Sequence, residues 1–329
     1  MTELAIGVDI GGTKMHAAAV DRTGRIVLER IAPTLAQEGG EAVLLRALEL
    51  TGAVLAEAER LSGARLAGIG IGSAGQIDFA TGKVAYAGGT MPGWTGIPLG
   101  AAVKERFGLP VWTDNDVNVF AVGEKALGAA REFDHFVCLM LGTGVGGAIM
   151  EGGRLVRGAF GGAGELGHLS VNFDGPRCYC GNYGCLELYA SGTGIARLAR
   201  EQAAAETAAA GTDKADGAAG VPEGGSEGPD SHAVIRGWLA GEPWAVRIMD
   251  KVVLALGTGI SSLVHTFNPQ AVIIGGGVAA TGEPLMAAIR ERVKAQTYPS
   301  MGGHLRILPA GLGAGAGVIG AAAQVWVYG

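Results

Sequence analysis

The chain has 329 residues, of which 48% are hydrophobic and 17% are charged, and its formal net charge is −6. This length fits two globular domains with sizeable cores, and the lack of a basic excess argues against a nucleic-acid or membrane-surface binder. No apolar run reaches the ~18 residues of a membrane span and no signal peptide is visible, so the predicted location is cytoplasmic.

The N-terminal stretch is predicted to form a strand, a polar turn and a second strand, at Leu4–Val8 and Met15–Val20. The turn between them contains Asp9, Gly11, Gly12, Thr13 and Lys14. It is a hairpin tip rather than a P-loop, whose signature does not occur in the chain. Backbone N–H groups of the tip could approach an anion, and an aspartate could hold a metal ion through water. Taken alone, a plain hairpin turn is slightly favoured.

An amphipathic helix is predicted over Glu41–Leu61, followed by a buried strand at Leu66–Ile71 that leads into a turn containing Gly75. Trp94 lies in the turn-rich stretch Gly88–Leu99. An aromatic side chain there could wall a ligand cleft, but a place in the core is the preferred interpretation.

A short strand at Val111–Thr113 runs into Asp114-Asn115-Asp116-Val117-Asn118, and a helix is predicted from about Val119 to Ala130. Asp and Asn are ordinary helix N-caps, so capping is the simplest role for Asp116. Capping needs one residue, however, whereas this stretch holds four polar side chains in five positions. A carboxylate beside a helix start, at the carboxyl end of a strand, is where α/β proteins place chemistry.

A second hairpin follows, with a strand at Phe136–Leu141 and a tip that contains Gly142, Thr143 and Gly144. The tip matches G-x-G-x-x-G, but the dinucleotide fingerprint needs a helix after the glycines, and the following residues indicate strands at Ala148–Met150 and Leu155–Val156. The similarity to the first hairpin suggests two duplicated domains that offer their tips to one polyphosphate.

The stretch Gly161–Glu187 holds three of the four cysteines and one histidine within eighteen positions: His168, Cys178, Cys180 and Cys185. Cys₃His is a standard closed set of structural zinc ligands. A disulfide within Cys-x-Cys is too cramped, a catalytic zinc would leave one position open, and nucleobase deaminases need Pro-Cys-x-x-Cys. Glu165 and Glu187 flank the set; rigid hydroxyl-binding carboxylates and plain surface charges are equally good interpretations. Thiolate ligands also fit a reducing interior.

The remainder is predicted to contain helices, strands, a low-complexity loop and a glycine turn. The acidic, Gly/Ala/Pro-rich stretch 211–231 is predicted to be a mobile surface loop without a catalytic part. Gly275, Gly276 and Gly277 follow a buried strand; they could let a flat ring lie against the backbone, or form a simple turn. The predicted elements are helices at Ser191–Ala210, Val246–Phe267 and Gly311–Val327 and strands at Ala271–Ile274 and Leu305–Leu308.

Assembled, these features resemble the ROK family of sugar kinases, and most of all its bacterial glucokinases. The most specific piece is G-H-x₉-C-x-C-G-x₂-G-C-x-E, which runs here from Gly167 to Glu187. The family also has the D-x-G-G-T/G-K turn, the N-D-x-N turn, the second G-T-G-x-G turn and the G-G-G turn, which occur in this order in the chain.

The resemblance implies an α/β, two-domain fold of the actin, hexokinase and Hsp70 (ribonuclease H-like) type with a central cleft and a structural zinc loop. The expected domains are residues 1–117 and 118–311, with 312–329 as a terminal helix on the first. It also implies that ATP with Mg²⁺ donates a phosphoryl group to a hexose, in a homodimer or homotetramer without nucleic-acid or membrane partners. Asp116 would be the general base, and sugar hydroxyls would be held by Gly75, Asn115, Asp116, Glu165, His168 and Glu187. The two hairpin tips would hold ATP phosphates, and Gly275 to Gly277 would lie at adenosine.

Two departures from the family's motifs stand out. Ala74 replaces the usual proline of the G-x-P-G turn, which loosens that loop slightly and changes little. Thr90-Met91-Pro92-Gly93-Trp94 replaces N-L-P-G-W, and a hydroxyl where an amide is expected leaves the choice of hexose open. The phosphoryl donor also stays open. Glucose is the expected sugar, with fructose, mannose or an N-acetylhexosamine as alternatives. The family's sugar-responsive repressors carry a helix-turn-helix before the sugar domain, and only three residues precede the first strand here.

Overall fold

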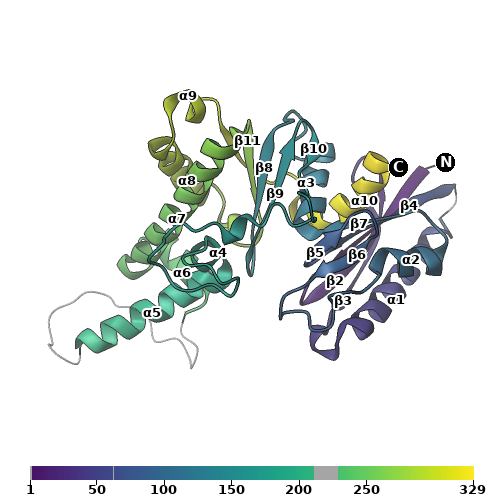
Figure 1. Cartoon of the computed structure of the whole chain (residues 1–329), viewed down its shortest axis with the longest axis horizontal. Coiled ribbons are helices and arrows are strands. Elements are labelled where there is room, and N and C mark those ends of the chain that lie inside the picture. The colour runs from purple at the N-terminus through teal and green to yellow at the C-terminus, as the bar shows by residue number, and fades with distance from the viewer. Residues whose placement is uncertain (1, 62, 211–228) are drawn as a thin grey trace. The chain divides into compact units, whose positions relative to one another are not determined.

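The computed structural model describes residues 2–61, 63–210 and 229–329 (Figure 1). The predicted loop at 211–231 therefore lies outside the described residues, except for its last three positions. Contacts divide the chain into two compact units. Unit 1 comprises Met1–His135, Ala148–Gly164 and Ala310–Gly329, and unit 2 comprises Phe136–Gly147 and Glu165–Pro309.

The first sheet of five strands has the order β3-β2-β1-β4-β7 among the described residues. β1 and β2 form an antiparallel hairpin extended by β3, whereas β4 and β7 are parallel to β1. Two parallel neighbouring strands need a long crossover connection, and a helix lies in each of these connections. Within Met1–His135 and Ala310–Gly329, the strands and α-helices of unit 1 are β1 (Thr2–Ile10), β2 (Lys14–Asp21), β3 (Ile26–Pro33), α1 (Gly40–Ala58), β4 (Ala64–Ser73), β5 (Gln76–Asp78), β6 (Lys83–Tyr86), α2 (Leu99–Phe107), β7 (Val111–Asn115), α3 (Asp116–Leu127) and α10 (Ala316–Tyr328).

Alternation along β1 explains how the two faces of this sheet differ. Leu4, Ile6 and Val8 belong to a large apolar cluster with residues of α1, whereas Ala5 belongs to a smaller cluster with residues of α10. Side chains of a strand alternate between faces, so the small residues come together on the side of α10. There a Cβ added at Gly7 would lie 2.0 Å from the Val318 carbonyl oxygen. The terminal helix therefore packs directly on the sheet backbone.

Glu124 fastens the start of this terminal segment to α3. Its side chain is fully buried and accepts hydrogen bonds from the backbone N–H groups of Ala129, Gly311 and Leu312, at 2.7 to 3.1 Å. A buried carboxylate is tolerated where such donors satisfy it. The predicted terminal helix is confirmed, although it begins at Ala316, after a 3₁₀ turn at Gly313–Gly315. Because α3 packs on α10, the contacts place α3 in unit 1; the domain limits at residues 117 and 311 stay a prediction.

The second sheet of five strands has the order β10-β9-β8-β11-β12 in the described part of the chain. β9 and β10 are antiparallel, and β11 is parallel to both β8 and β12. This is the strand order of the first sheet, which agrees with the predicted duplication. The elements are β8 (Phe136–Leu141), β9 (Val145–Glu151), β10 (Arg154–Leu155), α4 (Glu187–Ala190), α5 (Gly192–Ala210), α6 (Ser231–Leu239), α7 (Pro243–Phe267), β11 (Ala271–Gly275), α8 (Glu283–Gln296), α9 (Pro299–Gly302) and β12 (Arg306–Pro309).

Within the described residues, α7 is the one helix with the length and apolar character to cross a membrane. Its most apolar window is 67% buried inside the fold, where α7 packs against α4, α5, α6 and α8. A core helix of a globular unit passes the same test of length and composition, and the burial identifies α7 as such a helix.

Candidate functional site

Three predicted site turns of unit 1 leave the sheet at the same edge. Ile10 pairs in register with Ser73, and Ser73 pairs with Asn115, so the three parallel strands end side by side. The carboxyl ends of parallel strands are where open α/β sheets bind ligands. The structure therefore brings the Asp9–Lys14 turn, the Gly75 turn and the start of α3 to one edge.

Asn115 and Asp116 are fixed by the start of α3. The Asn115 side chain accepts hydrogen bonds from the backbone N–H groups of Val117 and Asn118, at 2.8 and 3.2 Å, and its amide nitrogen donates to the Gly75 carbonyl oxygen at 3.0 Å. Asn115 is thus the N-cap, and α3 begins at Asp116, three residues earlier than predicted. Since a neighbour performs the capping, the simplest role considered for Asp116 is already taken. Gly75 has a φ of 96°, a backbone region that favours glycine.

Asp9 ends the β1 part of the first hairpin beside the start of α10. A Cβ added at Gly317 would lie 2.3 Å from an Asp9 carboxylate oxygen, so residue 317 must be small. Burial raises the pKa of Asp9, while the nearby His16 and Lys14 act to lower it. In the tip itself, the Gly11 N–H donates to the Lys14 carbonyl oxygen at 3.0 Å, and Gly12, Thr13 and Lys14 are exposed. A hydrated cation at this carboxylate would favour its charged form.

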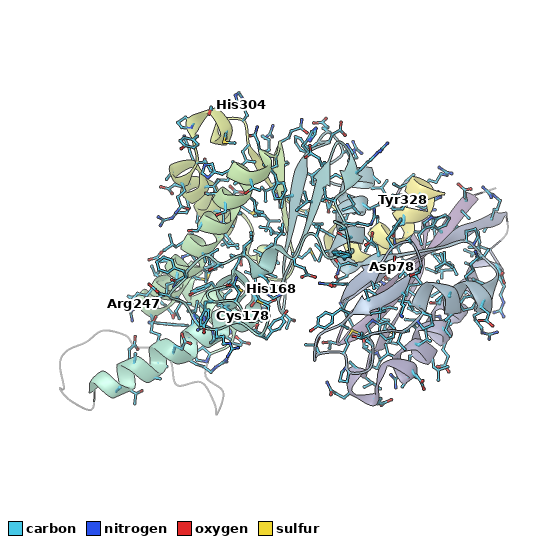
Figure 2. The ribbon with its side chains drawn as sticks, in the orientation of Figure 1. Asp78, His168, Cys178, Arg247, His304 and Tyr328 are labelled. Carbon is cyan, nitrogen blue, oxygen red and sulfur yellow. The ribbon has the colours of Figure 1, made fainter. Side chains whose placement is uncertain are left out.

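In unit 2, the four predicted metal ligands come together, and Figure 2 labels two of them, His168 and Cys178. The ligand atoms of His168, Cys178, Cys180 and Cys185 all lie within 4.8 Å of one another. Cys180 Sγ lies 3.6 Å from Cys185 Sγ, and Cys178 Sγ lies 3.7 Å from His168 Nδ1. Tetrahedral Zn²⁺ with Zn–S bonds of ~2.3 Å and a Zn–N bond of ~2.0 Å separates its ligand atoms by roughly 3.5 to 3.8 Å. The cluster therefore fits a structural zinc site, and none of its cysteines forms a disulfide.

The loop carries its ligands on a backbone of tight turns. Cys178 N–H donates to the Asn182 carbonyl oxygen at 2.7 Å and Gly181 N–H to the Cys178 carbonyl oxygen at 3.0 Å. Gly184 has a φ of 57°, and a Cβ there would lie 1.7 Å from the Asn172 carbonyl oxygen. Only glycine permits that approach, which brings Cys185 back toward His168.

Tyr179 lies between two of the cysteines in the sequence, and its side chain contacts the Nε2 side of the His168 ring. Its hydroxyl lies 3.0 Å from His168 Nε2, and the two rings meet edge to face with centroids 5.1 Å apart. With Nδ1 directed at the cysteines, a partner on Nε2 sets which nitrogen carries the proton. Burial of the hydroxyl and the charges of Glu187, Cys178 and Glu165 raise the pKa of Tyr179.

Glu187 links the zinc loop to the second hairpin tip. Its Oε2 accepts a hydrogen bond from the Val145 N–H at 3.0 Å, and a Cβ at Gly144 would lie 2.3 Å from the same oxygen. The Gly142 carbonyl oxygen accepts from the Gly192 N–H at 2.8 Å, and the Thr143 carbonyl oxygen accepts from the Thr193 hydroxyl at 2.8 Å. The tip is thus braced by α4 and by the start of α5. Glu165, by contrast, is exposed at the start of a 3₁₀ turn, Leu166–His168.

The glycine turn after β11 lies beside the same tip. Val278 N–H donates to the Leu141 carbonyl oxygen at 2.9 Å. Gly276 has a φ of 93°, and a Cβ there would lie 2.5 Å from that same oxygen. Gly275 to Gly277 are therefore adjacent to the strand end that leads into the second hairpin tip.

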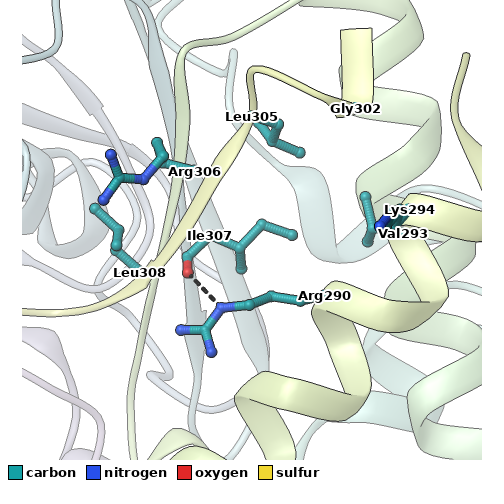
Figure 3. A pocket seen from close by; sticks show the side chains of 8 residues that line it. All are labelled: Arg290, Val293, Lys294, Gly302, Leu305, Arg306, Ile307 and Leu308. Atoms are coloured by element: carbon teal, nitrogen blue, oxygen red, sulfur yellow. Dashed lines mark hydrogen bonds between the residues drawn. The ribbon is translucent and has the colours of Figure 1, made fainter. Parts of the chain in front are cut away.

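A separate pocket in unit 2 contains none of the predicted site residues (Figure 3). It is formed by α8, Gly302 of α9 and the segment 305–308, and three of its lining side chains are cations: Arg290, Lys294 and Arg306. Arg290 donates from Nε to the Ile307 carbonyl oxygen at 3.0 Å and pairs with Glu283 at 2.6 Å. The Arg290 guanidinium therefore has structural partners, and it fastens α8 to β12.

Three residues at these sites were not predicted. Asp114 is buried and bonded to the start of α3, Arg157 pairs with it, and Tyr179 contacts His168. Asp114 belongs to the polar run noted in the sequence, so its type and position were a usable signal. Arg157 and Tyr179 carry no such signal, because their partners are side chains whose placement only the fold supplies. Trp94 is confirmed as a core residue: it is fully buried, and its indole N–H donates to the Ser73 hydroxyl at 3.0 Å.

Two similarly wound sheets with glycine turns at the strand ends and a Cys₃His loop define an α/β fold of the actin and hexokinase type. The model of the ROK family matches residues 5–326, and the chain belongs to that family. It is 37% identical to the glucokinase of Thermotoga maritima, over 97% of this chain and 96% of that protein.

Two solved structures share the fold over nearly their whole length. One is a ROK family glucokinase from Streptomyces griseus in complex with glucose and AMPPNP, with 35% sequence identity and a TM-score of 0.78. The match covers 97% of this chain and 98% of the glucokinase chain. The ROK hexokinase from Thermus thermophilus is 32% identical with a TM-score of 0.78, over 99% and 98% of the two chains. The predicted family and fold class are confirmed.

Proposed function

We propose that this chain is a glucokinase, which transfers the γ-phosphoryl group of ATP to the 6-hydroxyl of glucose. The chain is an ATP-dependent sugar phosphotransferase, and the observation that carries this is its full-length similarity to a ROK glucokinase solved with glucose and an ATP analogue. The aligned turns of unit 1 and the braced tip of unit 2 support it, since phosphoryl transfer depends on positioning and charge stabilisation more than on covalent chemistry.

Each predicted site residue has a role in this reaction. Asp116 accepts the proton of the attacking hydroxyl, while Asn115 and the Gly75 backbone bind sugar hydroxyls. Glu165, His168 and Glu187 bind further hydroxyls on the loop that zinc would keep rigid. Backbone N–H groups of Gly12, Thr13, Thr143 and Gly144 stabilise the phosphates. Mg²⁺ bound with ATP would neutralise its charge, Asp9 would hold that ion, and Gly275 to Gly277 would adjoin adenosine.

The Cys₃His cluster also supports a cytoplasmic location and a structural role for zinc. Thiolate ligands persist where thiols are kept reduced, so we place the enzyme in the cytoplasm. A zinc ion held by this cluster would be structural, because four side chains would fill a tetrahedron and leave no position for water. A homo-oligomeric state remains part of this proposal.

Substrate use is tested with the purified protein and a panel of hexoses, with ATP or inorganic polyphosphate as donor and sugar phosphate as readout. We expect glucose with ATP to give the highest kcat/KM. A higher value for mannose, fructose or an N-acetylhexosamine would move the assignment to that sugar. Glucose binding without phosphorylation of any hexose would instead indicate a sugar-sensing protein.

The role of Asp116 is tested by Asp116→Asn. An acid–base residue contributes typically ~10²–10⁴-fold to the rate, so kcat should fall by about that factor while glucose still binds. Asp250→Asn, which changes an exposed acid on α7, is the matched control and should keep full turnover. If the kcat of Asp116→Asn stays within about threefold of the wild-type value, as expected for an ordinary surface substitution, the assignment is rejected.

A further inference from the structure

Asp114 is the most deeply buried acid beside the predicted catalytic turn, and its two oxygens have separate tasks. Its side chain is 2% exposed. Oδ1 accepts the Asn115 N–H and the Asn118 amide, each at 2.8 Å. The first bond holds the backbone just before Asp116, and the second holds the side chain of Asn118, two residues after it. Asp114 therefore sets the direction in which the predicted base leaves the strand.

The other oxygen of Asp114 faces Arg157, which follows β10. Arg157 Nε and one terminal nitrogen lie 2.8 and 2.7 Å from Oδ2. The guanidinium also donates to the Tyr328 hydroxyl at 3.0 Å and lies 3.7 Å from the centre of the Phe79 ring. Burial acts to lower the pKa of Arg157, but Asp114 and Tyr328 outweigh it and raise the pKa, so the guanidinium stays charged.

Four segments far apart in sequence thus meet at one guanidinium. These segments are β7 with Asp114, the residue after β5, which is Phe79, the segment after β10 that carries Arg157 itself, and the last turn of α10 with Tyr328. The Phe79 and Tyr328 rings meet edge to face at 5.1 Å and restrict access to it. A buried ion pair is often no more stable than an apolar replacement, so stability alone does not explain this arrangement. A planar donor with a fixed fork is suited instead to orienting one carboxylate.

We propose that Arg157 is a positioning residue for phosphoryl transfer, which acts through Asp114 to fix the Asn115–Asn118 turn, with Tyr328 and Phe79 holding the guanidinium in its orientation. The proposal rests on the proposed function, because it assigns to that turn the base of the reaction. The same residue begins the segment that runs on to Glu165: the Ala163 N–H donates to the Arg157 carbonyl oxygen at 3.1 Å.

Arg157→Met keeps the stem and removes the guanidinium. We expect kcat to fall about 10²-fold, since a misplacement of ~1 Å can cost that much, while the KM for ATP, which is assigned to other turns, changes by less than about threefold. Arg157→Lys keeps the charge but not the fork and should recover only part of the rate. Tyr328→Phe removes one hydrogen bond and should cost about fivefold or less. Arg30→Met, which breaks an exposed ion pair with Glu57 in the same unit, is the matched control.

Two further measurements separate positioning from a loss of folding. All rates are taken well below the Tm of each variant, and Asp114→Asn, nearly isosteric, is combined with Arg157→Met. If Arg157 acts through Asp114, the double variant is no slower than the slower single variant. Hydrogen exchange over residues 114–118 should accelerate in Arg157→Met and not in Arg30→Met.

The outcomes distinguish this inference from the proposed function. An active wild type with unchanged kcat in Arg157→Met overturns the positioning role and leaves the glucokinase assignment intact. An inactive wild type overturns the proposed function and the positioning role in phosphoryl transfer with it, while accelerated exchange at 114–118 in Arg157→Met would then show only that Arg157 orders this turn. Equal acceleration of exchange throughout unit 1 would mean that the network only stabilises the fold, and would also overturn it.

Discussion

Asp9 is an acid in a position that disfavours its charge. Burial beside the start of α10 raises its pKa above the ordinary value, against the opposing effect of His16 and Lys14. The folded chain therefore binds this proton more tightly than the unfolded chain. Its stability falls as the pH rises from the unfolded pKa of ~3.9 through the folded value. Ligand-free protein at neutral pH should thus carry an unfavourable charge that a cation would relieve.

Asp9→Asn tests this point. The variant should have a higher Tm than the wild type at pH 7, with the difference shrinking as the pH falls toward ~4, because the wild-type carboxyl then becomes neutral. Thermal unfolding across this range, without nucleotide, measures it, and turnover should fall in the same variant. Asp21→Asn is the opposite control: burial acts against its charge, but hydrogen bonds from Thr23 and Arg25 prevail and lower the pKa of Asp21. Its loss should lower the Tm at pH 7, and a gain there would contradict the sign argued here.

The packing of α10 on the first sheet depends on glycines in the strands beneath it. A Cβ at Gly70 of β4 would lie 1.7 Å from the Ala321 carbonyl oxygen, and one at Gly123 of α3 would lie 2.7 Å from the Gly320 Cα. Both clashes involve backbone, which cannot rotate away as a flexible side chain can. The small residues of α10 and its partners therefore form one closely packed layer.

Gly70→Ala should destabilise unit 1 by about 3 kcal/mol, because α10 must shift off the sheet to admit one methyl group. The control is Gly89→Ala, at a position where an added Cβ meets nothing within 4 Å and φ is not positive. Chemical unfolding of both variants compares them. Equal midpoints would mean that α10 does not pack as closely as described.

Buried strands were easier to predict from the sequence than exposed ones. β8 was predicted at its observed bounds because FVCLML is an almost fully buried run, whereas β3 was missed because IVLERIAP is an exposed edge strand with no alternation. α8 was missed because its buried residues, Leu285, Met286, Ile289 and Val293, are outnumbered by charged and small ones. The N-terminus of α3 was placed late, since Asn115 caps it through its side chain and Asp114 supports it from the strand.

The duplicated architecture was predictable from two strand–turn–strand patterns, and the two sheets do share one strand order. The zinc ligands were predictable too, since ligand type and spacing suffice when a metal loop is local in sequence. The network around Asp114 was not predictable: Asp114 and Arg157 lie 43 positions apart, Arg157 and Tyr328 lie 171 positions apart, and sequence spacing says nothing about such pairs. Long-range side-chain networks therefore mark the limit of what the sequence alone could supply.

Loss of the metal should affect the two units unequally, because all four ligands lie in unit 2. Chelation, or Cys180→Ser, should release zinc, weaken glucose affinity and accelerate hydrogen exchange over residues 165–190 by about tenfold or more. Strands β1 and β4 of unit 1 should exchange as in the wild type. Cys138→Ala, which removes a thiol in β8 outside the loop, should retain stoichiometric zinc.

Wild-type protein that contains no zinc, or exchange that rises alike in both units, would contradict a local structural role. The expected pattern follows from the cluster itself: a closed tetrahedral set stabilises the loop that carries Glu165, His168 and Glu187, and nothing in its coordination reaches the sheet of unit 1.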